Sequence, residues 1–473
     1  MLSRNNTYTG KVNYRDIDFS FVFVGNELRL IPPADKETEI EWQWIMKPLG
    51  GGVYTFADPM PVDAGYLIAF CNETNQKIVF IPMQGSTLSF NNTVVIIEIE
   101  SFVICNSNDD KIDRVTFSCP EINYIHPINK AYTIQIPNES AKEGVMYFNT
   151  QNFELTTTEK QKFVVDEKEV QVFFGVTRTI SSKIEKPPLT LESVMYFEFE
   201  ATDDFSFILR LWQIARDFIR FLCYRNNIFL SKIELSAPAN DGEHRKFAAM
   251  YIVDSDEESE EKPLQKGRYI KQVRIAGKEG EILSDIASDS IYLRHLPETF
   301  ESGHHINAAR FVMITAAFEW EFNRLYPEGV KREEKRIIAE SAVSEEIQKA
   351  IEDNTGIKKN IYKFLLRLVK SDSLQSKIIQ AGKDLSGIID VFGNHLYRLN
   401  GQELKYSEMG GRLASQRNDF AHGNLDKDFI GLSLLDLIFL EMVVYAMQLK
   451  CYNVDDNKIQ KAVNDLFQQR LDL

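Results

Sequence analysis

Cysteine is scarce in this sequence of 473 residues, and no part of it is apolar over a long distance. The five cysteines lie far apart and form no Cys-x-x-Cys pair, which excludes a disulfide framework and a zinc ribbon. No window reaches the roughly 18 consecutive apolar residues of a membrane-spanning helix, and the first residues lack the apolar core of a signal peptide. These absences predict a soluble, cytoplasmic protein with reduced thiols.

Positive charge is also in short supply, because 54 Lys and Arg stand against 69 Asp and Glu, a formal net charge of -15. A balance of this sign repels nucleic acid over the whole molecule and excludes general DNA-coating roles. Nucleic-acid chemistry is still open to a local basic patch. Residues 301–473 hold 23 Lys and Arg against 25 Asp and Glu, so the acidity belongs to the preceding two thirds of the chain.

Short β-branched or alternating runs dominate the first part of the chain. Such runs, bounded by Gly, Pro, Asn and Asp, predict strands at 16–25, 66–72, 77–83, 93–105, 132–137 and 170–177. Strands of this kind form an all-β sandwich or barrel, and we expect a β-rich, sandwich-like domain over residues 1–190.

Residues 191–300 have a mixed α/β pattern. Near-helical apolar spacing predicts a buried helix over 205–224, and two strand-like runs follow it at 228–236 and 246–253. The acidic run at 254–261 is expected to be a solvated loop, because like charges repel. The functional alternative is an acidic segment that mimics nucleic-acid phosphates and shields a basic site.

The last part of the chain changes to long amphipathic segments. They predict helices near 304–326, 330–351, 357–371, 382–398, 407–422 and 430–452, and a short one that ends near 469. Pro327 and Gly329 separate the first two helices. The chain is therefore expected to be an α+β multidomain protein, with an all-α bundle over residues 301–473.

The hexapeptide Arg-Asn-Asp-Phe-Ala-His at 417–422 carries the clearest chemistry in the sequence. The unperturbed pKa of histidine as a residue type lies near working pH, so a histidine such as His422 suits a group that takes the proton of a ribose 2′-hydroxyl and returns one to the leaving oxygen. The planar guanidinium of Arg417 suits a scissile phosphate. On a regular helix Arg417 and His422 lie about 140° apart, so either the helix is distorted near Gly423, its expected C-cap, or the arginine reaches around it.

This hexapeptide in an all-α C-terminal domain resembles the R-N-x3-H motif of the HEPN superfamily, in which many members are metal-independent ribonucleases. The layout, with a β-rich region of about 300 residues in front, is similar to that of ApeA-like anti-phage defence proteins. The resemblance implies that Arg417 and His422 are catalytic and that Asn418 orients the pair or the substrate. Glu319 best matches the acidic residue of the first HEPN helix, and Glu321 is the second choice.

The resemblance also implies an endoribonuclease that needs neither metal nor cofactor and cleaves host RNA, with tRNA as the expected substrate, in abortive infection. It implies a homodimer through the HEPN domain, where Arg412 and Lys427 are candidates for RNA binding. The N-terminal region is expected to act as a sensor that holds the ribonuclease inactive until a phage-derived trigger appears.

Two alternatives are open at this stage. In the first, Arg417 and Asp419 lie on a solvent-exposed helix face and His422 caps the helix C-terminus, so these residues have only a structural role. The domain can also be a non-catalytic HEPN module that binds a partner or a nucleotide. The adjacent His304 and His305 do not predict a metal site, because neighbouring histidines point in different directions on a helix.

Overall fold

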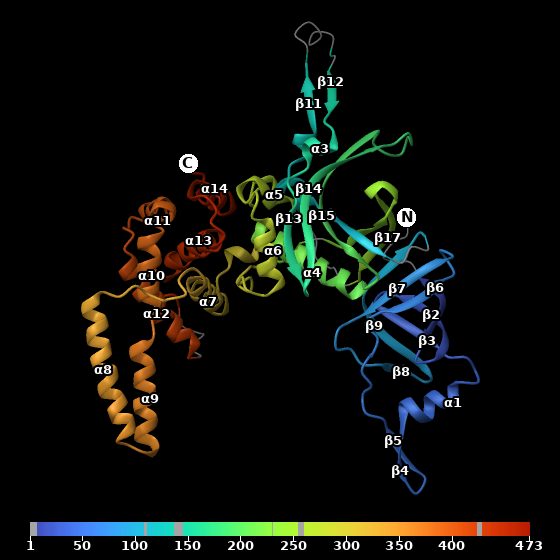
Figure 1. Cartoon of the computed structure of the whole chain (residues 1–473), viewed down its shortest axis with the longest axis horizontal. Helices are drawn as coiled ribbons and strands as arrows, with labels where there is room; N and C mark the ends of the chain where they lie inside the picture. Colours follow the sequence, from blue (N-terminus) through green and yellow to red (C-terminus); the bar gives the residue numbers. More distant parts are fainter. Residues whose placement is uncertain are drawn as a thin grey trace. The chain divides into compact units, whose positions relative to one another are not determined.

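The computed structural model describes residues 7–107, 111–136, 144, 146–228, 230–253, 260–422 and 428–473, without the side chains of residues 154, 241 and 370. The chain forms two compact units. The first contains Met1–Lys266 and Lys271–Ser288, and the second contains Gly267–Ile270 and Asp289–Leu473. We expected the helical domain to begin at 301, whereas the main part of the second unit begins at 289 (Figure 1).

A closed, barrel-like sheet forms the beginning of the first unit. Among the described residues its six strands are, in spatial order, β9 (Val94–Cys105), β3 (Glu27–Ile31), β2 (Ile17–Val24), β1 (Tyr8–Tyr14), β6 (Leu67–Cys71) and β7 (Gln76–Pro82). Antiparallel pairing of β7 with β9 closes the ring. The sequence pattern predicted either a sandwich or a barrel, and we expected a sandwich-like domain. This expectation is wrong, because the pairing of β7 with β9 joins the two edge strands of the sheet into a ring.

Alternation explains why these strands close around one core. In β2 the alternate residues Ile17, Phe19, Phe21 and Phe23 are buried, and the residues between them are more exposed. Gly10 in β1 is needed for the packing, because a Cβ atom at this position would lie 1.8 Å from the carbonyl oxygen of Phe70. The short elements beside the ring are α1 (Glu37–Ile40), β4 (Met46–Gly50), β5 (Val53–Phe56) and β8 (Ser89–Asn91).

The long strand β9 also belongs to a second, open sheet. Its first half pairs with β3, and Ser101 to Ile104 pair with β7 on one edge and with β17 on the other. The open sheet continues in the order β17 (His244–Ile252), β16 (Lys232–Pro238), β10 (Ile112–Phe117), β15 (Leu189–Thr202), β14 (Lys168–Ile180) and β13 (Gln161–Val165). Strands from both sides of the expected boundary at 190 therefore share one sheet.

Helices and a hairpin complete the first unit. The predicted buried helix is confirmed as α4 (Phe205–Cys223), and Phe207 on α4 contacts Phe199 of β15. The other elements are α2 (Pro120–Ile125), β11 (Tyr132–Gln135), β12 (Tyr147–Thr150), α3 (Phe153–Thr156), α5 (Glu261–Gln265) and α6 (Glu279–Ala287). Of the acidic run at 254–261, residues 254–259 lie outside the described residues, and Glu261 begins α5.

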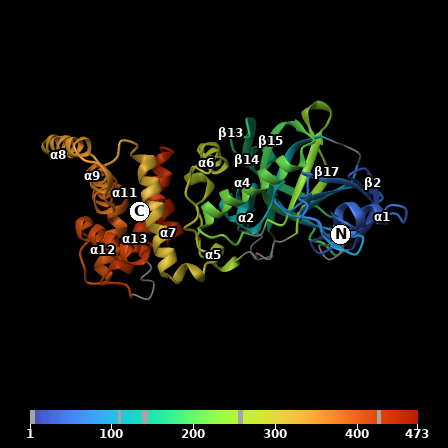
Figure 2. The same cartoon turned by 90° about the horizontal axis from the view of Figure 1, so that it is seen from below.

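The second unit is helical, as the sequence predicted. Its helices are α7 (Ala308–Leu325), α8 (Glu334–Glu352), α9 (Gly356–Lys370), α10 (Leu374–Asp384), α11 (Ser386–Leu399), α12 (Tyr406–Ala421), α13 (Ser433–Cys451) and α14 (Asp456–Leu466). Helix α13 is buried along almost its whole length, and α7, α11, α12 and α14 pack against it. Figure 2 shows α8 and α9 as a pair that stands apart from α7, α12 and α13.

The cysteines agree with the expectation of reduced thiols. All five are free, and four of them are buried as small apolar side chains: Cys71, Cys105, Cys119 and Cys223. The described helices include none with both the length and the apolar character needed to cross a bilayer.

Acid should destabilise the helical unit through His295. Burial lowers the pKa of this histidine to about 3, and the charge of Arg310 acts in the same direction. Because an unfolded histidine titrates near 6.5, the unfolded chain binds a proton that the folded unit does not, so stability falls as the pH decreases from about 6.5 towards 3. In urea unfolding followed by circular dichroism, wild type should lose roughly 2 kcal/mol more than His295→Gln between pH 6.5 and pH 5. Equal losses would contradict this assignment.

Candidate functional site

Helix α12 presents the hexapeptide at the end of a packed helix. Its buried side chains Met409, Leu413, Gln416 and Phe420 follow helical spacing and face α7, α10 and α13. Gly410 allows close approach to α10, because a Cβ atom there would lie 2.9 Å from the Cα atom of Gln375. This packing leaves Arg417, Asn418 and His422 on the less buried side and at the end of the helix.

Arg417 contacts the acidic residue that the resemblance selected. Its Nη2 atom donates a hydrogen bond of 2.8 Å to Oε2 of Glu319 on α7, and both side chains are partly exposed. A charge-assisted hydrogen bond of this length fixes the guanidinium at the rim of the helical unit. The structure thus brings together two of the predicted site residues that lie 98 positions apart.

Lys377 is a member of this cluster that the sequence analysis missed. Its Nζ atom lies 3.5 Å from Oε1 of Glu319, and the lysine is more buried than Arg417. Glu319 therefore bridges two cations, one from α10 and one from α12. A guanidinium and an ammonium on either side of one carboxylate are groups that can also bind a phosphate.

His422 is the C-cap residue of α12. The predicted helix end at 422 is confirmed to within one residue, and Gly423 lies outside the described residues. The backbone N–H of His422 donates to the carbonyl oxygen of Asn418 at 3.1 Å, so the helix is regular up to this point. Of the two geometries open from the sequence, the regular helix favours an arginine that reaches around to the substrate.

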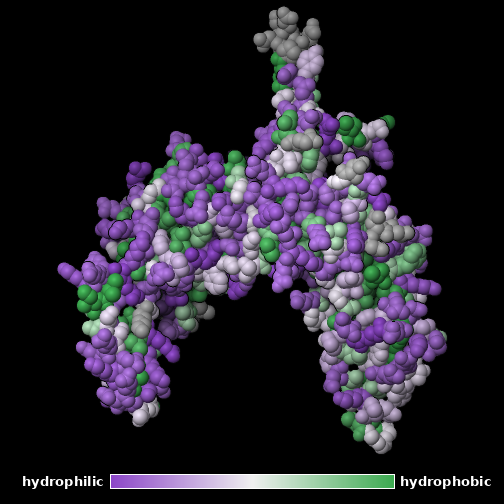
Figure 3. Space-filling view, viewed as in Figure 1, coloured by the Kyte–Doolittle hydropathy of each residue, from purple (hydrophilic) through white to green (hydrophobic). Residues whose placement is uncertain are grey.

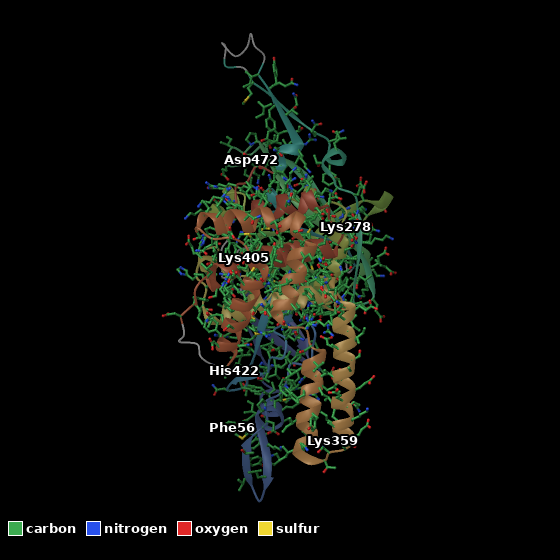
Figure 4. The ribbon with its side chains drawn as sticks, turned by 90° about the vertical axis from the view of Figure 1, so that its left-hand side faces the viewer. Phe56, Lys278, Lys359, Lys405, His422 and Asp472 are labelled. Atoms are coloured by element: carbon green, nitrogen blue, oxygen red, sulfur yellow. The ribbon has the colours of Figure 1, made fainter. Side chains whose placement is uncertain are left out.

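The side chains of Asn418 and His422 are exposed, and Figure 4 shows His422 where the ribbon of α12 ends. They share one face of the helix because they are four residues apart.

Glu321, the second choice for the acidic position, is turned away from this cluster. It is fully buried, accepts a 2.9 Å hydrogen bond from the backbone N–H of Tyr292, and forms a 2.5 Å ion pair with Arg324. Burial raises the pKa of its carboxyl group. Glu321 therefore belongs to the interior of the unit, and Glu319 occupies the exposed position.

Arg412, a candidate for RNA binding, is engaged in packing. Its Nε and Nη2 atoms donate to both carboxylate oxygens of Asp436 on α13 at 2.7 and 2.8 Å, and the hydroxyl of Tyr397 donates to the same carboxylate. The hydrogen bond to Asp436 raises the pKa of Arg412, and burial with the Asp436 hydrogen bond raises that of Tyr397. Lys427, the other candidate, lies outside the described residues.

Gln416 positions the chain that returns after the hexapeptide. This fully buried side chain accepts hydrogen bonds from the backbone N–H of Ile430 at 2.8 Å and from the hydroxyl of Ser433 at 3.3 Å. It ties the start of α13 to α12 one residue before Arg417. The sequence analysis did not single out Gln416, because only the fold reveals its partners.

The structure brings together Arg417, Glu319 and Lys377, and among the described residues it leaves Asn418 and His422 exposed at the end of the same helix without a contact to these three. An anchored guanidinium and an imidazole are groups that bind a phosphate and transfer a proton. Within the described residues, no group of three or more His, Cys, Asp and Glu side chains is placed to hold a metal ion. No family model, curated protein or solved structure matches this chain.

Proposed function

We propose that the chain is a metal-independent endoribonuclease of the HEPN type that cleaves host RNA, with tRNA as the expected substrate, in anti-phage defence. The observation that carries the proposal is the R-N-x3-H motif at the exposed end of α12, with Arg417 paired to Glu319 on α7. The family resemblance assigns catalysis to the residues of the motif and matches Glu319 to the acidic position of the first HEPN helix. This pairing across two helices supports the resemblance, because it involves the chemical groups that a phosphate-cleaving site needs.

The proposed reaction is a transesterification within the RNA. His422 takes the proton of a ribose 2′-hydroxyl, and the resulting oxygen attacks the adjacent phosphorus. Arg417 stabilises the charge that develops on the non-bridging oxygens. The bond between phosphorus and the 5′-oxygen breaks, and this oxygen takes a proton from the imidazolium of His422. The products are a 2′,3′-cyclic phosphate and a 5′-hydroxyl end, so the chemistry consumes neither metal nor cofactor.

In this proposal the protein works as a cytoplasmic homodimer, and its N-terminal unit restrains the helical unit until a phage-derived trigger appears. The reason for restraint is physiological, since an unregulated ribonuclease poisons the cell that makes it. A non-catalytic HEPN module that binds a partner or nucleotide is the second candidate. It is favoured by the ion pair that already occupies Arg417.

Incubation with total tRNA in the presence of EDTA tests the two candidates. Wild type, and a fragment of residues 289–473 tested beside it to remove restraint, should produce fragments with cyclic-phosphate ends. A His422→Ala preparation made in the same way should produce none, which also controls for contaminating nucleases. Cleavage that EDTA abolishes, or that His422→Ala retains, would refute the ribonuclease. An inactive wild type and an inactive but folded fragment would favour the binding module.

A further inference from the structure

A cavity of about 400 Å³ lies in the first unit, where the proposed ribonuclease site has no part. Its walls come from helix α4, from the end of β7 with the loop that follows it, from β9, and from the loop at 62–65. Pockets that bind small molecules have volumes of roughly 300–1,000 Å³. The cavity lies near the lower end of this range, so it can hold one small ligand.

One face of α4 lines the cavity along its length. Ser206, Arg210 and Gln213 are separated by four and three residues, so they lie on the same face of the helix. From Ser206 to Gln213 this face is about 10 Å long, at 1.5 Å per residue. Ser206 is exposed, whereas Arg210 and Gln213 are partly buried. The cavity therefore has its mouth near Ser206 and its deep end near Gln213.

Glu100 of β9 provides a hydrogen-bond acceptor at the deep end. Its side chain is partly buried, and burial raises the pKa of the carboxyl group, while the charge of Arg216 and a hydrogen bond from Gln213 oppose this shift. The contact with Gln213 places the carboxylate at the inner end of the α4 face. Further N–H donors from a ligand would stabilise this carboxylate, because they replace the water that burial removes.

Arg210 provides hydrogen-bond donors to the same cavity. Its Nη2 atom donates a hydrogen bond of 2.8 Å to the carbonyl oxygen of Ala287, which leaves Nε and Nη1 for another acceptor. Arg210 and Glu100 both line the cavity, but among the described residues they form no ion pair with each other. A ligand with donors on one edge and acceptors on the next can therefore bridge them.

Asp63, the other carboxylate in the lining, is already paired. It accepts hydrogen bonds from the hydroxyl of Tyr14 at 2.8 Å and from Nε of Arg15 at 3.0 Å. The charges of Glu100 and Arg210 then offset each other in the rest of the cavity. A neutral polar ligand suits this balance better than a cation or an anion.

Apolar side chains complete the walls. Leu209 lines the cavity from α4, and Val62, Ile81 and Pro82 line it from the loop at 62–65 and from β7. Figure 3 shows hydrophobic residues beside hydrophilic ones over the visible face of the first unit, and the cavity has the same mixed character. A flat ring system can bury its faces against aliphatic groups while its edges meet the polar side chains.

We infer that this cavity binds the guanine base of a nucleoside or mononucleotide. Guanine carries N1–H and the N2 amine side by side, and a carboxylate such as that of Glu100 can accept both. The neighbouring O6 and N7 atoms are acceptors that match the guanidinium of Arg210. The ribose then lies at the mouth, near Ser206. This inference goes beyond the proposed function, because neither the site nor its test involves RNA cleavage.

Isothermal titration calorimetry of the full chain tests the inference with wild type alone. Guanosine, its monophosphate GMP and GTP should bind one site with dissociation constants below about 1 mM and within roughly threefold of each other, because the base carries the affinity. Inosine monophosphate, IMP, lacks only the N2 amine and should bind at least about tenfold more weakly. AMP should bind more weakly still, because its N1 atom turns a lone pair towards the carboxylate.

Two variants assign the two edges of the base. Glu100→Gln should weaken GMP binding by at least about tenfold and should reduce the preference for GMP over IMP to about threefold or less. Arg210→Met should weaken GMP and IMP equally, because both bases carry O6 and N7. Glu98→Gln is the matched control, since Glu98 is an exposed residue of the same strand outside the lining, and its affinities should equal those of wild type. All three variants should keep the wild-type circular dichroism spectrum.

Four outcomes would overturn the inference. They are a wild type that binds neither guanosine nor GMP, IMP or AMP binding as tight as that of GMP, GTP binding without guanosine binding, and a Glu100→Gln variant that keeps the full preference for GMP over IMP. Binding of L-glutamine or glycine in place of GMP would assign the carboxylate and the guanidinium to a zwitterionic amino acid and would likewise remove guanine.

Discussion

Replacing Arg417 with alanine should lower the rate of tRNA cleavage by roughly 10²–10³-fold, because a positioned donor that stabilises developing charge contributes this much to a reaction. The measurement is a single-turnover cleavage rate with protein in excess. The variant should fold normally, since Arg417 is partly exposed and an ion pair of this kind contributes at most about 1 kcal/mol. Arg398→Ala is the control, because Arg398 is exposed on α11 and outside the cluster.

A double-mutant cycle with Glu319 separates positioning from other roles. If Glu319 acts by holding the guanidinium of Arg417, Glu319→Gln should slow cleavage by about tenfold in the wild-type background. It should have little further effect in the Arg417→Ala background, because the interaction is already lost. Full, multiplicative effects of both changes would show that the two residues act independently. Wild-type rates in Arg417→Ala would remove this arginine from the mechanism.

Replacing Asp436 with alanine should reduce the free energy of unfolding of the helical unit by about 3–5 kcal/mol. Asp436 is fully buried and holds the guanidinium of Arg412 and the hydroxyl of Tyr397. Its removal leaves the buried hydroxyl of Tyr397 and the partly buried guanidinium of Arg412 without their shared acceptor, which costs more than the ion pair itself contributes. Urea unfolding followed by circular dichroism measures the loss.

Two further variants make the Asp436 prediction specific. Asp456→Ala breaks an exposed ion pair with Lys450 and should cost less than about 1 kcal/mol. A triple variant with Asp436→Leu, Arg412→Met and Tyr397→Phe removes every member of the buried network, so it should recover a large part of the loss. A triple variant as unstable as Asp436→Ala would mean that the cost arises from packing and not from unpaired charge.

The sequence predicted most helices of the second unit because their apolar residues repeat with helical spacing. It missed α10, an eleven-residue helix, and with it Lys377. The signal was present, since Ser373 caps the helix by accepting a hydrogen bond from the backbone N–H of Ser376 and the apolar residues Leu374, Ile378 and Ala381 follow it. The predicted strand positions in the first part of the chain were confirmed, but their closure into a ring was not predictable, because it depends on pairing between distant segments.

For the candidate site too, the sequence predicts the local motif but not most contacts between residues that are distant in the chain. The hexapeptide is contiguous and visible in the sequence, and the family resemblance selected Glu319, which the structure places against Arg417. The partners of Arg412 and Gln416 are set by how α12 packs on α13, so no local pattern distinguishes them from surface residues. Arg412 was therefore expected at an RNA surface although its guanidinium contacts a buried carboxylate.

Strand β9 belongs to both sheets, so the first unit cannot be cut between them without exposing an edge of this strand. Ser101 to Ile104 have hydrogen-bonded neighbours on both edges, one in the closed ring and one in the open sheet. A fragment that keeps either sheet alone leaves an apolar strand with an unpaired edge, which is a template for aggregation. Recombination during evolution, and truncation at the bench, must therefore carry both sheets together.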